Sequence, residues 1–336
     1  MNHARTVAGA LSTVLIVAVA ADCAAQATST ELRTDSGQAY PSRPVRIVVP
    51  SSPGGGTDIL TRLLTPGLTE RLGQTVIVDN RGGAGSIIGN DIVAKAPPDG
   101  YTLLMGISTL AILPAMRKKL PYDAFTDLAP ITQAIAAPNI IVVHPSLPAK
   151  SVKELIAFAS KHPNEINYAS AGTGTNPHLT MELFLSMTHV KMVHIPYKGL
   201  GPGMVDLLAG HVVAAAATML TGLPHVKSGR LRGLATTGAK RSSVLPGLPT
   251  VAEAGVPGYE AVQWYGLFAP AGTPKEIIAK VHDAASSVLR SAAISRKLAA
   301  DGTDPVANTP EEFARVLRAE TEKWGKVVRA AGIKPE

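Results

Sequence analysis

Short apolar runs that alternate with helical segments are the feature that most constrains the fold of this 336-residue chain. Residues 45–49, 75–78 and 101–105 are mostly apolar runs, and residues 58–72 and 86–96 between them have apolar side chains at helical spacing. Strands that are apolar along their whole length are typical of a parallel sheet covered by helices on both faces. The first hundred residues therefore predict an α/β unit.

The same alternation restarts after a proline-rich break at residues 114–138. Further strands are expected at residues 140–143, 166–169, 193–195, 212–217 and 231–236, with a helix at 177–187. A chain of this length suggests about two domains. We expect one lobe to comprise residues 43–139 plus 267–336 and the other residues 140–266, with crossings near 140–143 and 264–269.

The amino terminus resembles an export signal. Arg5 precedes an apolar stretch at residues 7–21, and Ala25-Gln26-Ala27 is a pattern that signal peptidases cleave. The stretch is shorter than the about 20 residues that span a bilayer, although an uncleaved anchor remains an alternative. We expect residues 1–27 to be a cleaved signal peptide and the mature protein to be periplasmic. Asp22 argues against lipidation of Cys23, so the mature chain would lack cysteine.

Composition and motifs exclude several function classes. The net charge is +7, but the basic residues are scattered and aromatic residues make up only 4%, so no nucleic-acid partner is expected. The chain contains no Gly-x-Ser-x-Gly or His-Glu-x-x-His motif, and its nine histidines are dispersed, so we expect no catalytic residues and no metal site. The glycine cluster at residues 81–89 departs from the dinucleotide fingerprint. It is interpreted as a strand-to-helix turn, and no cofactor is expected.

Two small-residue loops are the candidate ligand-binding segments, because each joins a predicted strand to a helix. Glycine lets the backbone expose its N–H groups, and a helix amino terminus adds partial positive charge, so both loops suit an anion. Such loops, one in each lobe, could hold a carboxylate across a cleft. The candidates are Ser51, Pro53, Gly54, Gly55, Thr57 and Asp58 in the first loop, and Ser170, Gly172, Thr173, Gly174, Thr175 and His178 in the second. Ser108, after the third strand, is added because ligands bind at carboxyl strand ends.

Several segments together resemble a known family of receptors. They include Pro50-Ser-Ser-Pro-Gly-Gly-Gly-Thr-Asp58, Asn80-Arg-Gly-Gly-Ala-Gly85, Tyr168-Ala-Ser-Ala-Gly172, Pro196-Tyr-Lys-Gly199 and Leu248-Pro-Thr-Val-Ala-Glu-Ala-Gly255. The chain is similar to the Bug, or TctC-like, solute receptors of tripartite tricarboxylate transporters from about residue 44 to 333.

The resemblance implies a two-lobed α/β periplasmic binding protein of the Venus-flytrap type (type II-like), with a mainly parallel sheet flanked by helices in each lobe. It also implies a small carboxylate ligand held by one loop from each lobe, permease subunits of the transporter as partners, and no catalysis. We expect a monomer.

One departure from the family bears on the ligand. Many relatives have Phe-Asp-Asn where this chain has Ala216-Ala217-Thr218, and an ammonium group would need that carboxylate. The resemblance therefore implies a ligand without a free amine.

Two other functions remain open: a periplasmic hydrolase or isomerase using Ser170, His178 and Asp58, and a co-receptor for a sensor kinase.

Overall fold

The computed structural model describes residues 40–330, 333 and 335, so the expected signal peptide and Cys23 lie outside the described residues. The chain begins with three parallel strands. β1 (Val45–Val49) lies between β2 (Val76–Asn80) and β3 (Thr102–Ile107), and Ile47 pairs with Val78 on one side and Leu103 on the other. Helix α1 (Gly56–Leu72) connects β1 to β2. A 3₁₀ turn (Ala84–Ser86) and α2 (Ile87–Ala94) connect β2 to β3. These elements form the predicted first α/β unit.

A second parallel trio has the same plan. β5 (Asn167–Ser170) lies between β6 (Val193–Pro196) and β7 (Ala214–Thr218). Helix α5 (Asn176–Thr188) connects β5 to β6, and α6 (Leu200–Ala209) connects β6 to β7. Both candidate loops therefore lead from a parallel strand into a helix, as the sequence predicts.

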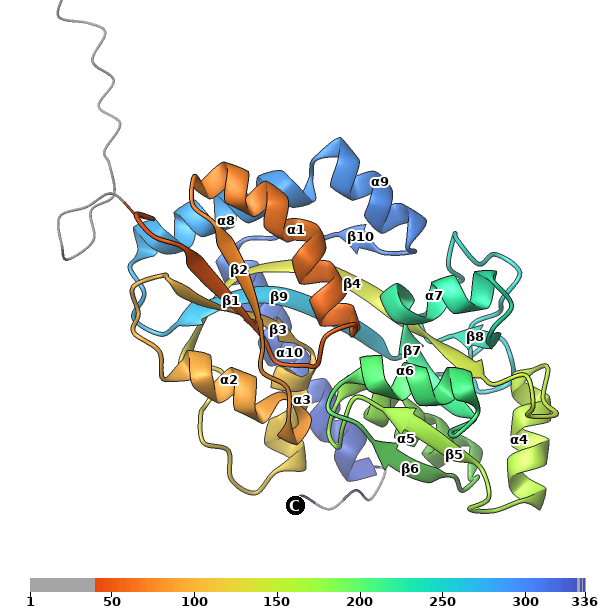
Figure 1. Cartoon of the computed structure of the whole chain (residues 1–336). Helices are drawn as coiled ribbons and strands as arrows, with labels where there is room; N and C mark the ends of the chain where they lie inside the picture. The colour runs from red at the N-terminus through yellow and green to blue at the C-terminus, as the bar shows by residue number, and fades with distance from the viewer. Residues whose placement is uncertain (1–39, 331–332, 334, 336) are drawn as a thin grey trace, which may run out of the picture. The chain divides into compact units, whose positions relative to one another are not determined.

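Two long antiparallel strands join the trios. They are β4 (Leu128–Val143) and β9 (Val262–Pro270), and the strand order is β2-β1-β3-β9-β4-β7-β5-β6 (Figure 1). The first part of β4 pairs with β9, and its last residues pair with β7 and with β8 (Arg232–Thr236). Each half is thus a mixed sheet, with a parallel trio next to antiparallel strands. The fold is the expected α/β type.

The proline-rich segment 114–138 is a break only in its middle, because residues 117–127 form neither helix nor strand. Helix α3 (Thr109–Met116) runs into its start, and the first half of β4 occupies its end. Pro130 precedes a register shift in the pairing of β4 with β9, and Pro138 is the last residue of that pairing. Proline is tolerated where a ladder is irregular or where one pairing ends, so neither residue prevented β4 from forming.

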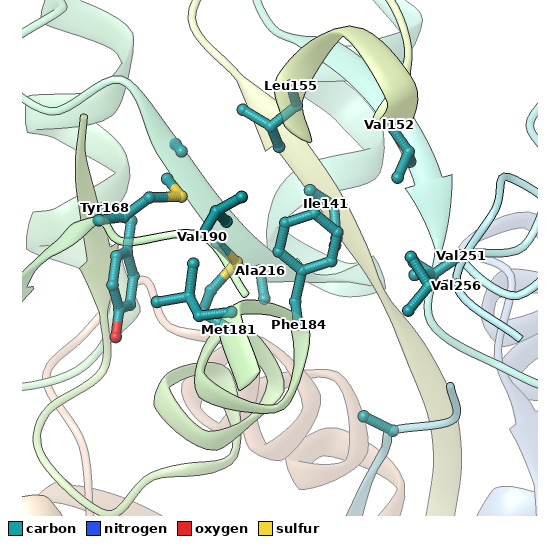
Figure 2. Close-up of a cluster of buried hydrophobic side chains, with 14 of the residues drawn as sticks. Ile141, Val152, Leu155, Tyr168, Met181, Phe184, Val190, Ala216, Val251 and Val256 are labelled. Atoms are coloured by element: carbon teal, nitrogen blue, oxygen red, sulfur yellow. The ribbon is translucent and has the colours of Figure 1, made fainter. Parts of the chain in front are cut away.

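Helix α10 contributes to two of the buried clusters, one in each half of the fold. Val48, Leu104 and Phe268 pack with Phe313 and Leu317, from the first part of α10 (Pro310–Ala330). The second cluster, part of which is drawn in Figure 2, includes the labelled Ile141, Tyr168, Phe184 and Ala216 together with Trp324 and Val328 from the later part of α10. The remaining elements are α4 (Val152–Lys161), α7 (Met219–Lys227), α8 (Lys275–Leu289), α9 (Ala292–Ala300) and β10 (Asp304–Pro305).

Candidate ligand-binding site

A small cavity lies where the amino ends of α1 and α5 come together. It measures about 30 Å³, which is room for about two water molecules. The first loop and α1 supply Ser51, Gly55, Gly56 and Thr57, and the second loop and α5 supply Ala171, Thr175 and Pro177. The other lining residues are Ser86, Ile107, Leu200, Thr218, Gln263 and Tyr265. Four of the thirteen sequence candidates, Ser51, Gly55, Thr57 and Thr175, thus meet at one cavity.

Ser51, which lines this cavity, has a hydroxyl that makes no hydrogen bond among the described residues. The residue is 7% exposed, and its Oγ is buried and has no hydrogen-bond partner among the described residues. A buried polar atom without a partner costs about 1–3 kcal/mol, and folded proteins seldom leave one unless water or a ligand completes it. The Ser51 hydroxyl is therefore available to a bound molecule.

Asp58 folds the first loop and does not line the cavity. Its carboxylate accepts hydrogen bonds from the Gly54 amide at 3.0 Å and from Arg62 Nε at 2.9 Å. Burial alone would raise the pKa of Asp58, but these two donors, together with the Asn80 side chain and the charge of Arg62, hold the pKa below its usual value. The negative charge of Asp58 is thus paired with Arg62 on the same helix. Pro53 and Gly54, which has a φ of +78°, belong to the same turn and are also absent from the lining.

The second loop is tied together by its own side chains. Thr175 Oγ1 donates to the Gly172 carbonyl at 2.6 Å, and Ser170 Oγ accepts from the Gly172 amide at 3.0 Å. Ser170 Oγ is also 2.6 Å from His194 Nε2. Of this loop's six candidates only Thr175 lines the cavity; Ser170, Gly172, Gly174 and His178 form hydrogen bonds that hold the loop, and Thr173 is absent from the lining.

His178 holds the second loop in place by accepting a hydrogen bond as a neutral imidazole. Its Nδ1 accepts the Gly174 amide at 3.2 Å, and its ring is stacked on that of His194 with centroids 4.0 Å apart. Burial, and then the nearby charge of His194, lower the pKa of His178 to about 3. His178 is therefore uncharged at neutral pH and leaves Nδ1 free to accept.

Ser108 reaches the cavity only through a neighbour. It is fully buried, and its hydroxyl donates to Gln263 Oε1 at 3.0 Å. Gln263 lies near the start of β9 and lines the cavity. Ser108, directly after β3, thus orients the carboxamide of Gln263, a residue that was not among the candidates from the sequence.

Tyr265 and Thr218 are further lining residues outside the thirteen candidates, although Thr218 belongs to the 216–218 departure noted in the sequence. An added Cβ on Gly56 would lie 2.6 Å from the Tyr265 hydroxyl and 2.8 Å from Thr218 Oγ1, so glycine is needed there for the two hydroxyls to approach α1. Burial raises the pKa of Tyr265, which keeps its phenol protonated and able to donate. Tyr265 lies inside an apolar strand run, where no local pattern distinguishes it from a core residue.

The two halves are also in contact near the cavity through backbone atoms, at positions where glycine allows a close approach. The Ser52 amide donates to the Lys198 carbonyl at 3.0 Å. A Cβ added at Gly201 would lie 2.5 Å from the carbonyl oxygen of Pro53. A Cβ added at Gly85 would clash in the same way with the carbonyl oxygen of Thr173. The glycine cluster at residues 81–89 is therefore more than the expected strand-to-helix turn, because it borders the second loop.

Comparison with known proteins identifies the family. Residues 60–333 match the family described as TctC, the tripartite tricarboxylate transporter family receptor. The chain belongs to this family. It is 40% identical over 301 residues to Protein BugT of Bordetella pertussis, covering 89% of this chain and 92% of that protein.

Solved structures of similar proteins agree with this assignment. The R. palustris protein Rpa4515 with adipate has a TM-score of 0.86 and 38% identity, covering 88% of this chain and all of that one. MatC from Rhodopseudomonas palustris with bound malate has a TM-score of 0.81 and 31% identity, covering 86% of this chain and all of that one. The resemblance to the Bug receptors and the periplasmic-binding-protein fold are both confirmed, and this TctC-family protein is a solute-binding receptor.

The residues of the alternative hydrolase hypothesis have other partners in this receptor. Asp58 bonds to Gly54 and Arg62, Ser170 to His194, and His178 to Gly174. Over residues 40–330 no hydrogen bond joins any two of Ser170, His178 and Asp58. Within the same range no three metal-binding side chains gather, and no helix is both long and apolar enough to cross a bilayer.

Proposed function

We propose that this receptor binds a small carboxylate-bearing solute in the periplasm, with the carboxylate between the amino ends of α1 and α5. The single observation that carries this proposal is the cavity shared by the two helix starts, whose lining includes Ser51 with its unpartnered hydroxyl. The amino end of a helix has unsatisfied amides and a partial positive charge. Two such ends at one cavity favour an anion without any cationic side chain.

Binding and closure are coupled in this proposal. Residues 43–139 plus 267–336 and residues 140–266 act as two lobes, connected through β4 and β9 and bridged by α10. The cavity holds only about two water molecules while the loops touch. A larger solute must therefore enter while the lobes are apart, and it favours closure because only the closed state offers it both loops.

The closed receptor then delivers its solute to the permease subunits of a tripartite tricarboxylate-type transporter. The protein acts as an exported monomer and performs no chemistry on the solute. The separate partners of Ser170, His178 and Asp58 support this absence of catalysis. Mass spectrometry of the tightest-binding acid after incubation with the protein is expected to recover it unchanged, and a converted product would contradict the proposal.

Ser51→Ala is expected to weaken carboxylate binding about tenfold. A neutral donor to a charged acceptor contributes about 1.5 kcal/mol, which corresponds to about tenfold in affinity. Isothermal titration with the tightest-binding acid measures the change. Stability without ligand should not fall, since the variant removes a hydroxyl that has no partner among the described residues.

Thr236→Val is the matched control for Ser51→Ala. Thr236 Oγ1 is also buried and without a partner among the described residues, but Thr236 lies in β8 and does not line the cavity. The control should bind with the affinity of the parent chain. Equal binding by Ser51→Ala and the parent would remove the main support for the proposed site.

A further inference from the structure

Asn139 stands at the point where β4 changes its pairing partner. The preceding residue, Pro138, is the last residue of β4 to pair with β9, and it lies opposite Val262. Asn139 is the first residue of β4 to pair with β7, and it lies opposite Thr218, which lines the cavity. The chain therefore passes from one half of the fold to the other at Asn139.

Thr237 ties this point to the second strand that joins the halves. The Asn139 amide donates to Thr237 Oγ1 at 2.7 Å, and the Thr237 amide donates to the Asn139 carbonyl at 2.9 Å. Thr237 also exchanges two hydrogen bonds, of 2.6 and 2.8 Å, with Ala261, which directly precedes β9. The two crossing strands are thus joined through one threonine.

The Asn139 side chain connects the same point to the amino end of α5. Its Nδ2 donates to Asn176 Oδ1 at 2.7 Å and to Thr180 Oγ1 at 3.1 Å. Asn176 is the first residue of α5, and its own Nδ2 donates to the Val262 carbonyl at 2.9 Å. Asn139, Asn176, Thr180 and Thr237 are all fully buried, and we call these four residues the crossing network.

The crossing network is in direct contact with parts of the cavity lining. Thr175 and Pro177 flank Asn176 in the chain, and Thr218 is the strand partner of Asn139; all three line the cavity. The four residues of the network are themselves absent from the lining. The network can therefore act on a bound solute only through the residues that it holds.

We propose that Asn139 is a positioning residue for solute binding, which fixes the amino end of α5 to both crossing strands. This inference rests on the proposed function, because the place of α5 matters to the solute only if the amino end of that helix binds the carboxylate. Without the Asn139 side chain, the buried Asn176 carboxamide loses a donor, and a buried polar group favours arrangements in which it regains a partner. A receptor whose α5 is correctly placed for only part of the time binds its solute more weakly by that fraction.

Asn139→Ala is expected to weaken the binding of each acid at least about tenfold, with the rank order of the acids unchanged. The variant removes two side-chain hydrogen bonds, and the loss of one corresponds to about threefold to tenfold in an equilibrium. Isothermal titration with malate, adipate, hexanoate and benzoate measures the change. A uniform loss is the mark of a residue that positions the site, since Asn139 touches no part of the solute.

Asn90→Ala is the matched control. Asn90 is also fully buried, its Nδ2 donates to the Tyr122 hydroxyl at 2.8 Å, and its Oδ1, like that of Asn139, has no partner among the described residues. Asn90 lies in α2 and does not line the cavity. Both alanine variants should melt at a lower temperature than the parent chain, but Asn90→Ala should keep the parent's affinity.

A double variant distinguishes positioning from general destabilisation. Asn176→Ala removes the other side of the same hydrogen bond, so Asn139→Ala combined with Asn176→Ala should bind about as tightly as the weaker of the two single variants. Residues that act as one unit show such non-additive losses, whereas independent residues show losses that multiply. Multiplied losses in the double variant would overturn the coupling of Asn139 to α5.

The remaining outcomes separate this inference from the proposed function. A folded Asn139→Ala variant with the parent's affinity, or one that loses affinity for some acids only, overturns the inference and leaves the carboxylate receptor standing. If Asn139→Ala does not fold, Thr180→Val replaces it, because valine has nearly the shape of threonine and removes only one hydroxyl of the network. This variant should lose about threefold in affinity for every acid, and parent affinity would overturn the inference. Absence of binding by the parent chain to every acid contradicts the proposed function, and the inference with it.

Discussion

Gly201→Ala is expected to weaken ligand binding about 150-fold without destabilising the ligand-free protein. The added Cβ would lie 2.5 Å from the Pro53 carbonyl oxygen, and 3.2 Å from both Gly54 C and Gly55 N, in the closed arrangement. Overpacking of this kind costs about 3 kcal/mol when the neighbour is backbone and cannot turn aside, which corresponds to about 150-fold. Gly201 is near the start of α6, and alanine favours helix by up to about 1 kcal/mol relative to glycine. Isothermal titration and thermal melting measure the two effects separately.

Gly247→Ala is the control, because an added Cβ at Gly247 has nothing within 4 Å. It should leave affinity unchanged. If Gly201→Ala bound its solute as tightly as the parent chain, the close approach of α6 to the first loop would have no part in ligand capture.

Acidification from pH 7 to pH 4 is expected to cost about 3 kcal/mol of stability through His178 alone. Burial and the neighbouring His194 lower the pKa of His178 to about 3 in the folded protein, against about 6.5 in an unfolded chain. The unfolded state therefore takes up the proton first as the pH falls, so this stability is present above pH 6.5 and is lost on the way down to pH 3. Each pKa unit corresponds to about 1.4 kcal/mol. Urea unfolding of the ligand-free protein at several pH values measures the loss.

His178→Asn should flatten this part of the pH dependence, because an asparagine oxygen can accept the Gly174 amide but does not titrate. The control is His189→Asn at the other end of α5. His189 is exposed and has a φ of +56°, which asparagine tolerates. Identical pH profiles for His178→Asn and the parent chain would contradict a buried neutral His178.

The alternation of apolar runs with helical segments was enough to predict the two parallel trios of strands. The proline content of residues 114–138 hid the start of β4, the strand that joins them. The runs at 45–49 and 166–169 have the apolar character of strands covered on both faces, and each lies within a residue of an observed strand. The start of β4 carries Pro130, and a local pattern cannot show that a register shift accommodates it. Tertiary pairing with β9 outweighed the local signal.

The candidate site was predictable as two loops but not as a cavity. Local chemistry marks an amide-rich strand-to-helix turn, so Ser51, Gly55, Thr57 and Thr175 could be named from sequence. Tyr265 and Gln263 lie on a strand about 90 residues beyond the second loop, and only the crossing of β9 brings them to α1. The closeness of Gly85 to the second loop likewise depends on how the two halves pack.

A crystal structure of the protein with its tightest-binding acid would show whether one carboxylate is held by both loops at once. We expect a carboxylate oxygen within hydrogen-bond distance of Ser51 Oγ and of an amide of α1, and a second contact with the loop that contains Thr175. A carboxylate bound outside the cavity of Ser51, Thr175 and Tyr265, or held by one loop alone, would contradict this expectation.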